Sequence, residues 1–162
     1  MKLKFCIFVI LIFAFQACEK KVDNRFTKTW YDTEYRTPGR TTMQIKNDST
    51  FNYRAASCMW RCTSKGNWKV FGDTIELNST SIDTCYNMFP FADCPKYGTY
   101  YDKKILSTIP NCTAESETDY IIFKNEKFYL KKDSHMRKAN SNCPDSLSIV
   151  FAKTEKKKKN GY

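Results

Sequence analysis

Two groups of residues have side chains that enzymes use, and their spacing decides whether they can act together. The only histidine lies in Asp133-Ser134-His135, which holds the three residue types of a hydrolase triad. Members of a triad converge from separate elements of a fold, which three adjacent residues in a lysine-rich turn cannot easily do. The chain also lacks the G-x-S-x-G turn that presents a nucleophilic serine. We therefore expect an exposed loop here.

Glu115, Glu117 and Asp119 form the densest group among the 17 acidic residues. Paired carboxylates hydrolyse glycosidic bonds when one acts as acid and the other as base or nucleophile. Alternate spacing places all three on one face if this segment is a strand. A solvated loop or strand edge explains the same pattern. The sequence therefore predicts no enzyme and no cofactor.

Eight cysteines are present, and six of them fall between residues 58 and 143. These six are Cys58, Cys62, Cys85, Cys94, Cys112 and Cys143. An even number in an exported chain predicts three disulfides, although sequence alone does not fix the pairing. The local pairs Cys58–Cys62, Cys85–Cys94 and Cys112–Cys143 are our first expectation. Zinc is the alternative for the C-x₃-C spacing of the first pair, but a second Cys or His pair is missing, so we predict no metal.

The start of the chain predicts export. Lys2 and Lys4 precede an apolar run over residues 5–15, which is 11 residues long. A helix needs about 20 apolar residues to cross a bilayer, so this run fits a signal peptide better than a membrane span. The run ends on Phe15-Gln16-Ala17-Cys18. This stretch resembles the lipobox of bacterial lipoproteins, although Phe15 stands where leucine is usual.

The lipobox resemblance implies cleavage before Cys18 and a diacylglycerol group on the Cys18 thiol. Residues 1–17 would then be the signal peptide and residues 18–27 a lipidated tether. Because Glu19 follows the cysteine instead of the aspartate that retains some lipoproteins at the inner membrane, the outer membrane or cell surface is favoured. The alternative is an ordinary secretory signal with a coincidental cysteine. Both interpretations export the protein, and only the first predicts a membrane anchor.

The remaining chain has the alternating apolar and polar residues of β-strands. Without the first 17 residues it has 145 residues and a net charge of +8, because Lys2 and Lys4 leave. Strands are expected at 30–35, 43–46, 51–54, 66–70, 74–77, 104–107, 119–123, 127–131 and 147–151. No segment has a long helical period. We predict one all-β domain over 28–152, an antiparallel meander closed into a small barrel or strongly curved sheet, with a basic tail over 153–162.

A family resemblance supports this barrel. The segments Thr29-Trp30, Lys46–Phe51, Gly66-Asn67-Trp68 and Gly72–Leu77 are similar in order to motifs of the lipocalin-like domains of bacterial envelope lipoproteins. Lys28 and Ser49 stand where that pattern usually has glycine. The resemblance covers residues 28–79. It implies a barrel whose interior takes a small apolar ligand.

Two aromatic segments are candidate binding surfaces. Trp60 and Arg61 lie between two cysteines, and Tyr86, Phe89, Phe91 and Tyr97 lie in a cysteine-containing excursion over 78–102. Rigid aromatic loops make good contact surfaces because large side chains bury much area at little entropic cost. The alternative is that these rings fold inward and plug the barrel.

The sequence therefore favours a membrane-anchored binding module. Its partner would be a small apolar ligand in the barrel, or a protein held by the two cysteine-bounded loops, as in an inhibitor or immunity protein. A nucleic-acid partner is not expected of an exported protein, despite a sequence pI near 9.2. The basic tail is expected to be solvated or to lie on anionic lipid phosphates.

Overall fold

The computed structural model describes residues 25–33, 40–57, 59–92, 106–114, 118–131, 134–141, 143 and 149–154. These residues form strands and connections with no helix, which confirms the all-β prediction. The strands are β1 Lys28–Asp32, β2 Arg40–Ile45, β3 Thr50–Ala56, β4 Arg61–Phe71, β5 Thr74–Ser79, β6 Asn87–Pro90, β7 Leu106–Ser107, β8 Thr118–Ile122, β9 Glu126–Lys131, β10 His135–Lys138 and β11 Val150–Ala152.

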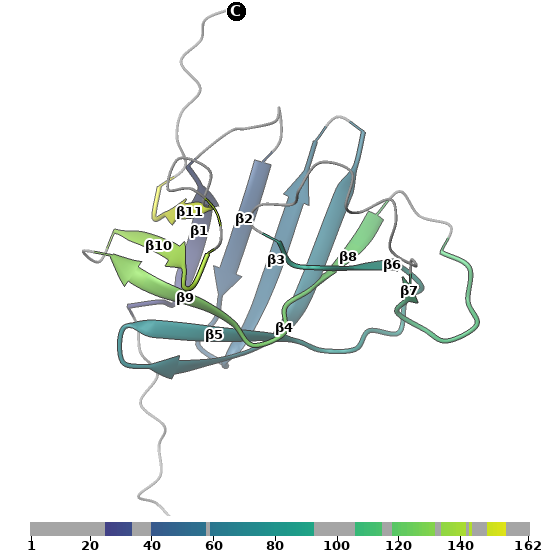
Figure 1. Ribbon diagram of the computed structural model, residues 1–162, viewed down its shortest axis with the longest axis horizontal. Helices are drawn as coiled ribbons and strands as arrows, with labels where there is room; N and C mark the ends of the chain where they lie inside the picture. Colours follow the sequence, from purple (N-terminus) through teal and green to yellow (C-terminus); the bar gives the residue numbers. More distant parts are fainter. Residues whose placement is uncertain are drawn as a thin grey trace, which may run out of the picture.

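Eight of these strands close into an antiparallel barrel (Figure 1). Around the barrel the order is β1-β2-β3-β4-β5-β9-β10-β11, and β11 returns to pair with β1. Each strand therefore follows its neighbour in sequence except where β9 succeeds β5. The predicted meander is confirmed, with β6, β7 and β8 inserted between its fifth and sixth strands.

Alternation of side chains explains why these strands bury one face. Met43, Ile45, Phe51 and Tyr53 from β2 and β3 are buried, as their spacing predicts. Trp68, Ile75 and Leu77 from β4 and β5 are buried as well. The turns have the local chemistry that hairpins need. Gly72 has a φ of 60°, and Asp48 Oδ1 accepts hydrogen bonds from Thr50 N at 3.0 Å and Thr50 Oγ1 at 2.6 Å.

Strand β4 is shared between the barrel and the insertion. Along one edge it pairs with β3, from Arg61 to Asn67. Along the other edge, Gly66 to Phe71 pair with β5, and Arg61 to Thr63 pair in parallel with β8. Strand β8 pairs in parallel with β6, which pairs with β7. The insertion is thus a three-stranded extension of the sheet, at the right of Figure 1, and these parallel pairings were not predicted.

The folded domain begins earlier than the sequence predicts. Phe26 is fully buried in the core, and its carbonyl accepts a hydrogen bond of 2.8 Å from Trp30 Nε1. Assigning residues 25–27 to the tether was therefore wrong, because Phe26 supplies apolar area to the core. Near the other end of the domain, Phe151 is fully buried and Ile149 packs against the core.

Candidate binding surfaces

The barrel interior is occupied by a continuous group of aromatic rings. Phe51 and Tyr53 meet Phe123 edge to face, at centroid distances of 5.3 and 5.2 Å. Phe91 stacks on Phe123 at 4.5 Å and contacts Phe128 at 5.7 Å. These distances lie within the range in which aromatic pairs attract one another. Through the interior, these ring contacts connect β3, the residue that follows β8, and β9.

Phe91 reaches this group from the extension. It is 8% exposed, and Phe91 N donates to Ile122 O at 2.8 Å, which fixes the residue beside the end of β8. Placing Phe91 on an external binding surface was therefore wrong, and the alternative that it plugs the barrel is correct. Tyr86 and Phe89, from the same segment, are half-buried, and Tyr97 lies outside the described residues.

The β3–β4 hairpin presents apolar side chains to solvent. Met59 is 89% exposed and Trp60 is 42% exposed, and Arg61 beside them is exposed too. The tip is held by a backbone hydrogen bond of 2.9 Å from Ser57 N to Trp60 O. We call Met59, Trp60 and Arg61 the hairpin tip. Of the sequence-predicted surface residues, Trp60 and Arg61 are thus placed where a partner can reach them.

The expected disulfide between residues 58 and 62 does not form, because Cys62 is not bonded to another cysteine. Cys62 is a thiol, it is 6% exposed, and it pairs with Ala55 across the two strands. Burial raises the pKa of the Cys62 thiol to about 12, and the nearby Asp119 carboxylate contributes in the same direction. A thiol held protonated is a poor nucleophile and a poor metal ligand. With Cys62 a thiol, the expected three disulfides among the six cysteines do not form.

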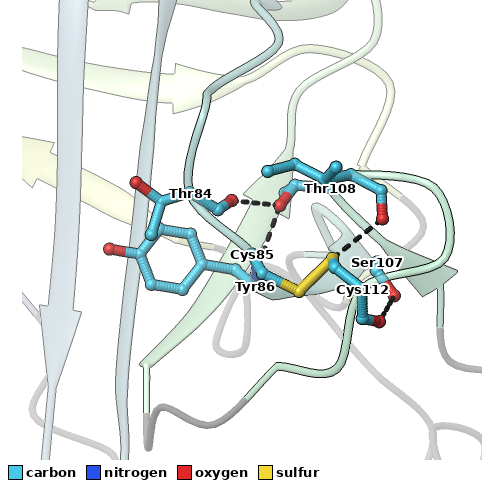
Figure 2. Close-up of a disulfide and its surroundings, with 7 residues drawn as sticks. Thr84, Cys85, Tyr86, Ser107, Thr108 and Cys112 are labelled. Carbon is cyan, nitrogen blue, oxygen red and sulfur yellow. Dashed lines mark hydrogen bonds between the residues drawn. A yellow bond between two sulfur atoms is a disulfide. The ribbon is translucent and has the colours of Figure 1, made fainter.

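Among the described residues, a disulfide joins Cys85 to Cys112 (Figure 2). The expected pairs Cys85–Cys94 and Cys112–Cys143 are therefore wrong. The pairing follows from the fold, because β6 and β7 are antiparallel neighbours, Cys85 lies shortly before β6 begins, and Cys112 lies in the connection that follows β7. Thr108 reinforces the link, since its Oγ1 bonds the Thr84 carbonyl and accepts from Tyr86 N at 2.9 Å. Cys58 and Cys94 lie outside the described residues.

Among the residues that the structure describes, the candidate catalytic side chains are not brought together. His135 is exposed and is the first residue of β10, where a loop was expected, and its Nδ1 lies 2.8 Å from Ser134 Oγ. Asp133, Glu115 and Glu117 lie outside the described residues. Asp119 lies on β8, where burial raises the pKa of its carboxyl and a hydrogen bond from Asn87 acts in the opposite direction. Within the described ranges, no group of three potential metal ligands occurs.

A second exposed aromatic site was missed in the sequence. Phe71 is 56% exposed at the end of β4, and Tyr129 on β9 is 38% exposed. Alternation assigns both residues to the outer face of their strands, so their exposure was predictable. Their proximity was not, because it depends on the pairing of β5 with β9 across the insertion.

Cys18, the expected signal peptide over residues 1–17 and most of the basic tail lie outside the described residues. In the part of the chain that the structure covers, no helix has the length and apolar character needed to span a membrane.

Comparisons with protein-family models, curated proteins and solved structures gave no match to this chain.

Proposed function

We propose that this chain is an exported lipoprotein that is held on the cell envelope by lipid on Cys18 and acts by binding rather than by catalysis. The lipobox resemblance supports the anchor. The Cys85–Cys112 bond supports export, because disulfides persist mainly in oxidising compartments. Residue Glu19 after the cysteine favours the outer membrane or the cell surface.

We further propose that the hairpin tip binds a protein partner in the envelope. The observation that carries this proposal is the joint exposure of Met59 and Trp60, at 89% and 42%, in the turn between β3 and β4 next to Arg61. Trp, Met and Arg are enriched at the centres of protein interfaces. A projecting cationic and apolar tip suits an acidic cleft on the partner, which is how an inhibitor or immunity protein would engage its target.

Site-specific photo-crosslinking in intact cells tests the tip. A photoreactive amino acid at position 59 is expected to give one discrete protein adduct, and the Trp60→Ser change is expected to abolish it. The matched control carries the same probe in place of Leu106, which is 54% exposed on β7. Absence of an adduct from position 59, or the same adducts from both positions, would refute the proposed site.

A small apolar ligand inside the barrel is the second candidate. It is compatible with the closed eight-stranded barrel and its buried aromatic group, because barrels of this size hold either packed side chains or one small ligand. Phe91 is the ring that would have to move, since it comes from the extension.

Native mass spectrometry of gently extracted protein should then show a bound compound of defined mass. Loss of that species in Phe128→Ala, and saturable one-to-one binding of 1-N-phenylnaphthylamine, would support a ligand. Failure of both would exclude it.

Intact mass measurement tests the anchor independently of either binding site. The wild-type protein extracted from membranes should start at Cys18 and carry added acyl mass. The Cys18→Ser variant should lack that mass and leave the membrane fraction. An unlipidated wild-type protein would instead support the ordinary secretory signal.

A further inference from the structure

The end of the barrel at the β4–β5 turn carries two exposed rings on one face. Phe71 lies opposite Thr74, and Thr74 lies opposite Tyr129 on the next strand. Directly opposed residues of neighbouring strands project to the same side of a sheet. Phe71 and Tyr129 therefore share the outer face of β4, β5 and β9, close to the turn that Gly72 and Asp73 form.

Lysines surround these rings. Lys69 and Lys127 flank Glu76 in the adjacent row of the same face, and Lys131 lies two residues beyond Tyr129. Lys127 Nζ is 5.9 Å from the centroid of the Phe71 ring and 3.6 Å from Glu76 Oε2. The three lysines are exposed, whereas the Glu76 side chain is only 15% exposed. We call Phe71, Tyr129, Lys69, Lys127 and Lys131 the cationic aromatic face.

The N-terminal segment reaches the barrel at this same end. Arg25 Nη1 forms a 2.5 Å ion pair with Asp73 Oδ1, and Arg25 Nη2 donates to Gly72 O at 2.9 Å. Phe26, the next residue, is fixed in the core. Cys18 precedes Arg25 by seven residues, which span at most about 25 Å when fully extended. A lipid on Cys18 therefore holds the β4–β5 turn near the bilayer surface.

The hairpin tip lies at the opposite end of β4. Ten residue steps separate Arg61 from Phe71, which corresponds to about 33 Å along the path of the strand. Figure 1 shows β4 running from the β3–β4 hairpin to the turn before β5, with these two hairpins on opposite sides of the barrel. The anchor thus brings the cationic aromatic face, and not the hairpin tip, within reach of lipid.

We propose that the cationic aromatic face rests on anionic lipid headgroups and so turns the hairpin tip away from the membrane. Aromatic rings partition to the level of the headgroups, and lysines gain from the negative potential of anionic lipids. The short connection to Cys18 selects this surface among all exposed surfaces of the barrel. The proposal rests on the lipid anchor of the proposed function, but not on the identity of the partner at the tip.

Quenching by brominated lipids tests this orientation. Full-length protein purified from membranes is reconstituted into vesicles that contain phosphatidylglycerol, in a Trp60→Phe background that leaves only buried native tryptophans among the described residues. Tryptophan is then placed at position 71 or, as the matched control at the other end of β4, at position 59. Brominated lipid is expected to lower the fluorescence of Phe71→Trp about twofold and to leave that of Met59→Trp nearly unchanged. Only the ring at position 71 is expected to enter the lipid–water interface. Lys69→Gln with Lys131→Gln, or vesicles of phosphatidylcholine alone, should weaken the quenching at position 71.

Flotation of the vesicles separates the two ways in which the experiment can fail. If the wild-type protein floats and Cys18→Ser does not, the anchor holds, and equal quenching at positions 59 and 71 overturns the orientation alone. Quenching at position 71 that persists unchanged in phosphatidylcholine vesicles overturns the role of the lysines. If wild-type protein does not float with vesicles, the anchor fails and the orientation fails with it.

Discussion

The backbone of Gly66 in β4 packs closely against the backbone of Asn78 in β5. A Cβ atom at position 66 would come within 2.0 Å of the Asn78 carbonyl oxygen and 2.7 Å of Ser79 Cα. Both obstacles are backbone atoms, so no side-chain rotation relieves them. This close approach occurs next to the place where β4 exchanges β8 for β5 as its neighbour along one edge. Glycine inside a strand often marks such an approach of a second backbone.

The Gly66→Ala change is expected to lower the free energy of unfolding by about 3 kcal/mol or more, since the strands must separate to admit the methyl group. Urea denaturation followed by circular dichroism measures this loss. Gly72→Ala is the matched control. Gly72 has a φ of 60° but open space around it, so that change should cost only about 1–2 kcal/mol of backbone strain. Equal losses in the two variants would contradict the steric role of Gly66.

The Tyr120 hydroxyl joins the three-stranded extension to the barrel, so its removal should lower the stability of the protein. Tyr120 is 2% exposed, and its hydroxyl lies 2.7 Å from Thr80 O and 2.9 Å from Lys65 O. Tyr120→Phe removes the donor and leaves these carbonyls without it, which should cost about 1–3 kcal/mol in thermal or urea unfolding. Tyr129→Phe, on the exposed face of β9, should change stability by less than about 0.5 kcal/mol. A neutral Tyr120→Phe variant would show that the hydroxyl is dispensable.

Two aspartates, Asp119 and Asp48, should change the free energy of unfolding with pH in opposite directions. Burial raises the pKa of Asp119 above its ordinary value of 3.8, so ionisation of this group favours the unfolded chain. Its contribution to stability is complete below pH 3.8 and is lost as the pH rises through the higher pKa of the folded state. Asp119→Asn should therefore be more stable than wild type at neutral pH, with a smaller advantage near pH 3.

Asp48 supplies the control for that experiment. The hydrogen bond from the Thr50 hydroxyl lowers the pKa of Asp48, so its contribution is present above pH 3.8 and is lost as the pH falls. Asp48→Asn should thus lose stability at neutral pH relative to wild type and lose little in acid. Denaturant titrations between pH 2.5 and pH 7 compare the two variants. A shift of the same sign in both would contradict the assigned causes.

Cys62 should be protected from thiol reagents as long as the barrel is folded. With a pKa of about 12 and 6% exposure, it offers neither thiolate nor access. A short pulse of iodoacetamide at pH 8 should leave the Cys62 peptide unmodified in the native protein and modify it fully in urea. Peptide mass mapping detects this difference. Rapid modification without denaturant would mean that the β3–β4 region opens far more readily than its packing implies.

The Cys85–Cys112 bond should stabilise the extension. It closes a loop with a sequence separation of 27 residues, so its removal by Cys85→Ser with Cys112→Ser is expected to cost about 3–4 kcal/mol through chain entropy. Non-reducing peptide mapping should recover the linked Cys85 and Cys112 peptides. Recovery of Cys85 linked to Cys94 would instead restore the local pairing that the sequence suggests.

The local sequence pattern predicted most strands of the barrel but few features of the candidate binding surfaces. Met43, Ile45, Phe51 and Tyr53 alternate with polar residues, so both their strands and their burial were predictable. Strands β6 and β10 have only four residues each and do not alternate cleanly, which is why they were missed. The inward turn of Phe91 and the partner of Cys85 depend on contacts between segments far apart in sequence. Local spacing does not contain that information.

The closure of the barrel also sets an order of events. Tyr31 pairs with Ala152, so the seam between β1 and β11 joins residues 121 positions apart. Contacts of such long range form slowly, because a large loop must close before any pairing energy is gained. Until then the edge of β1 remains open to pairing with other chains. A chain that emerges N-terminus first therefore exposes β1 longest, and its aggregation before closure, rather than the stability of the finished barrel, should limit the yield of folded protein.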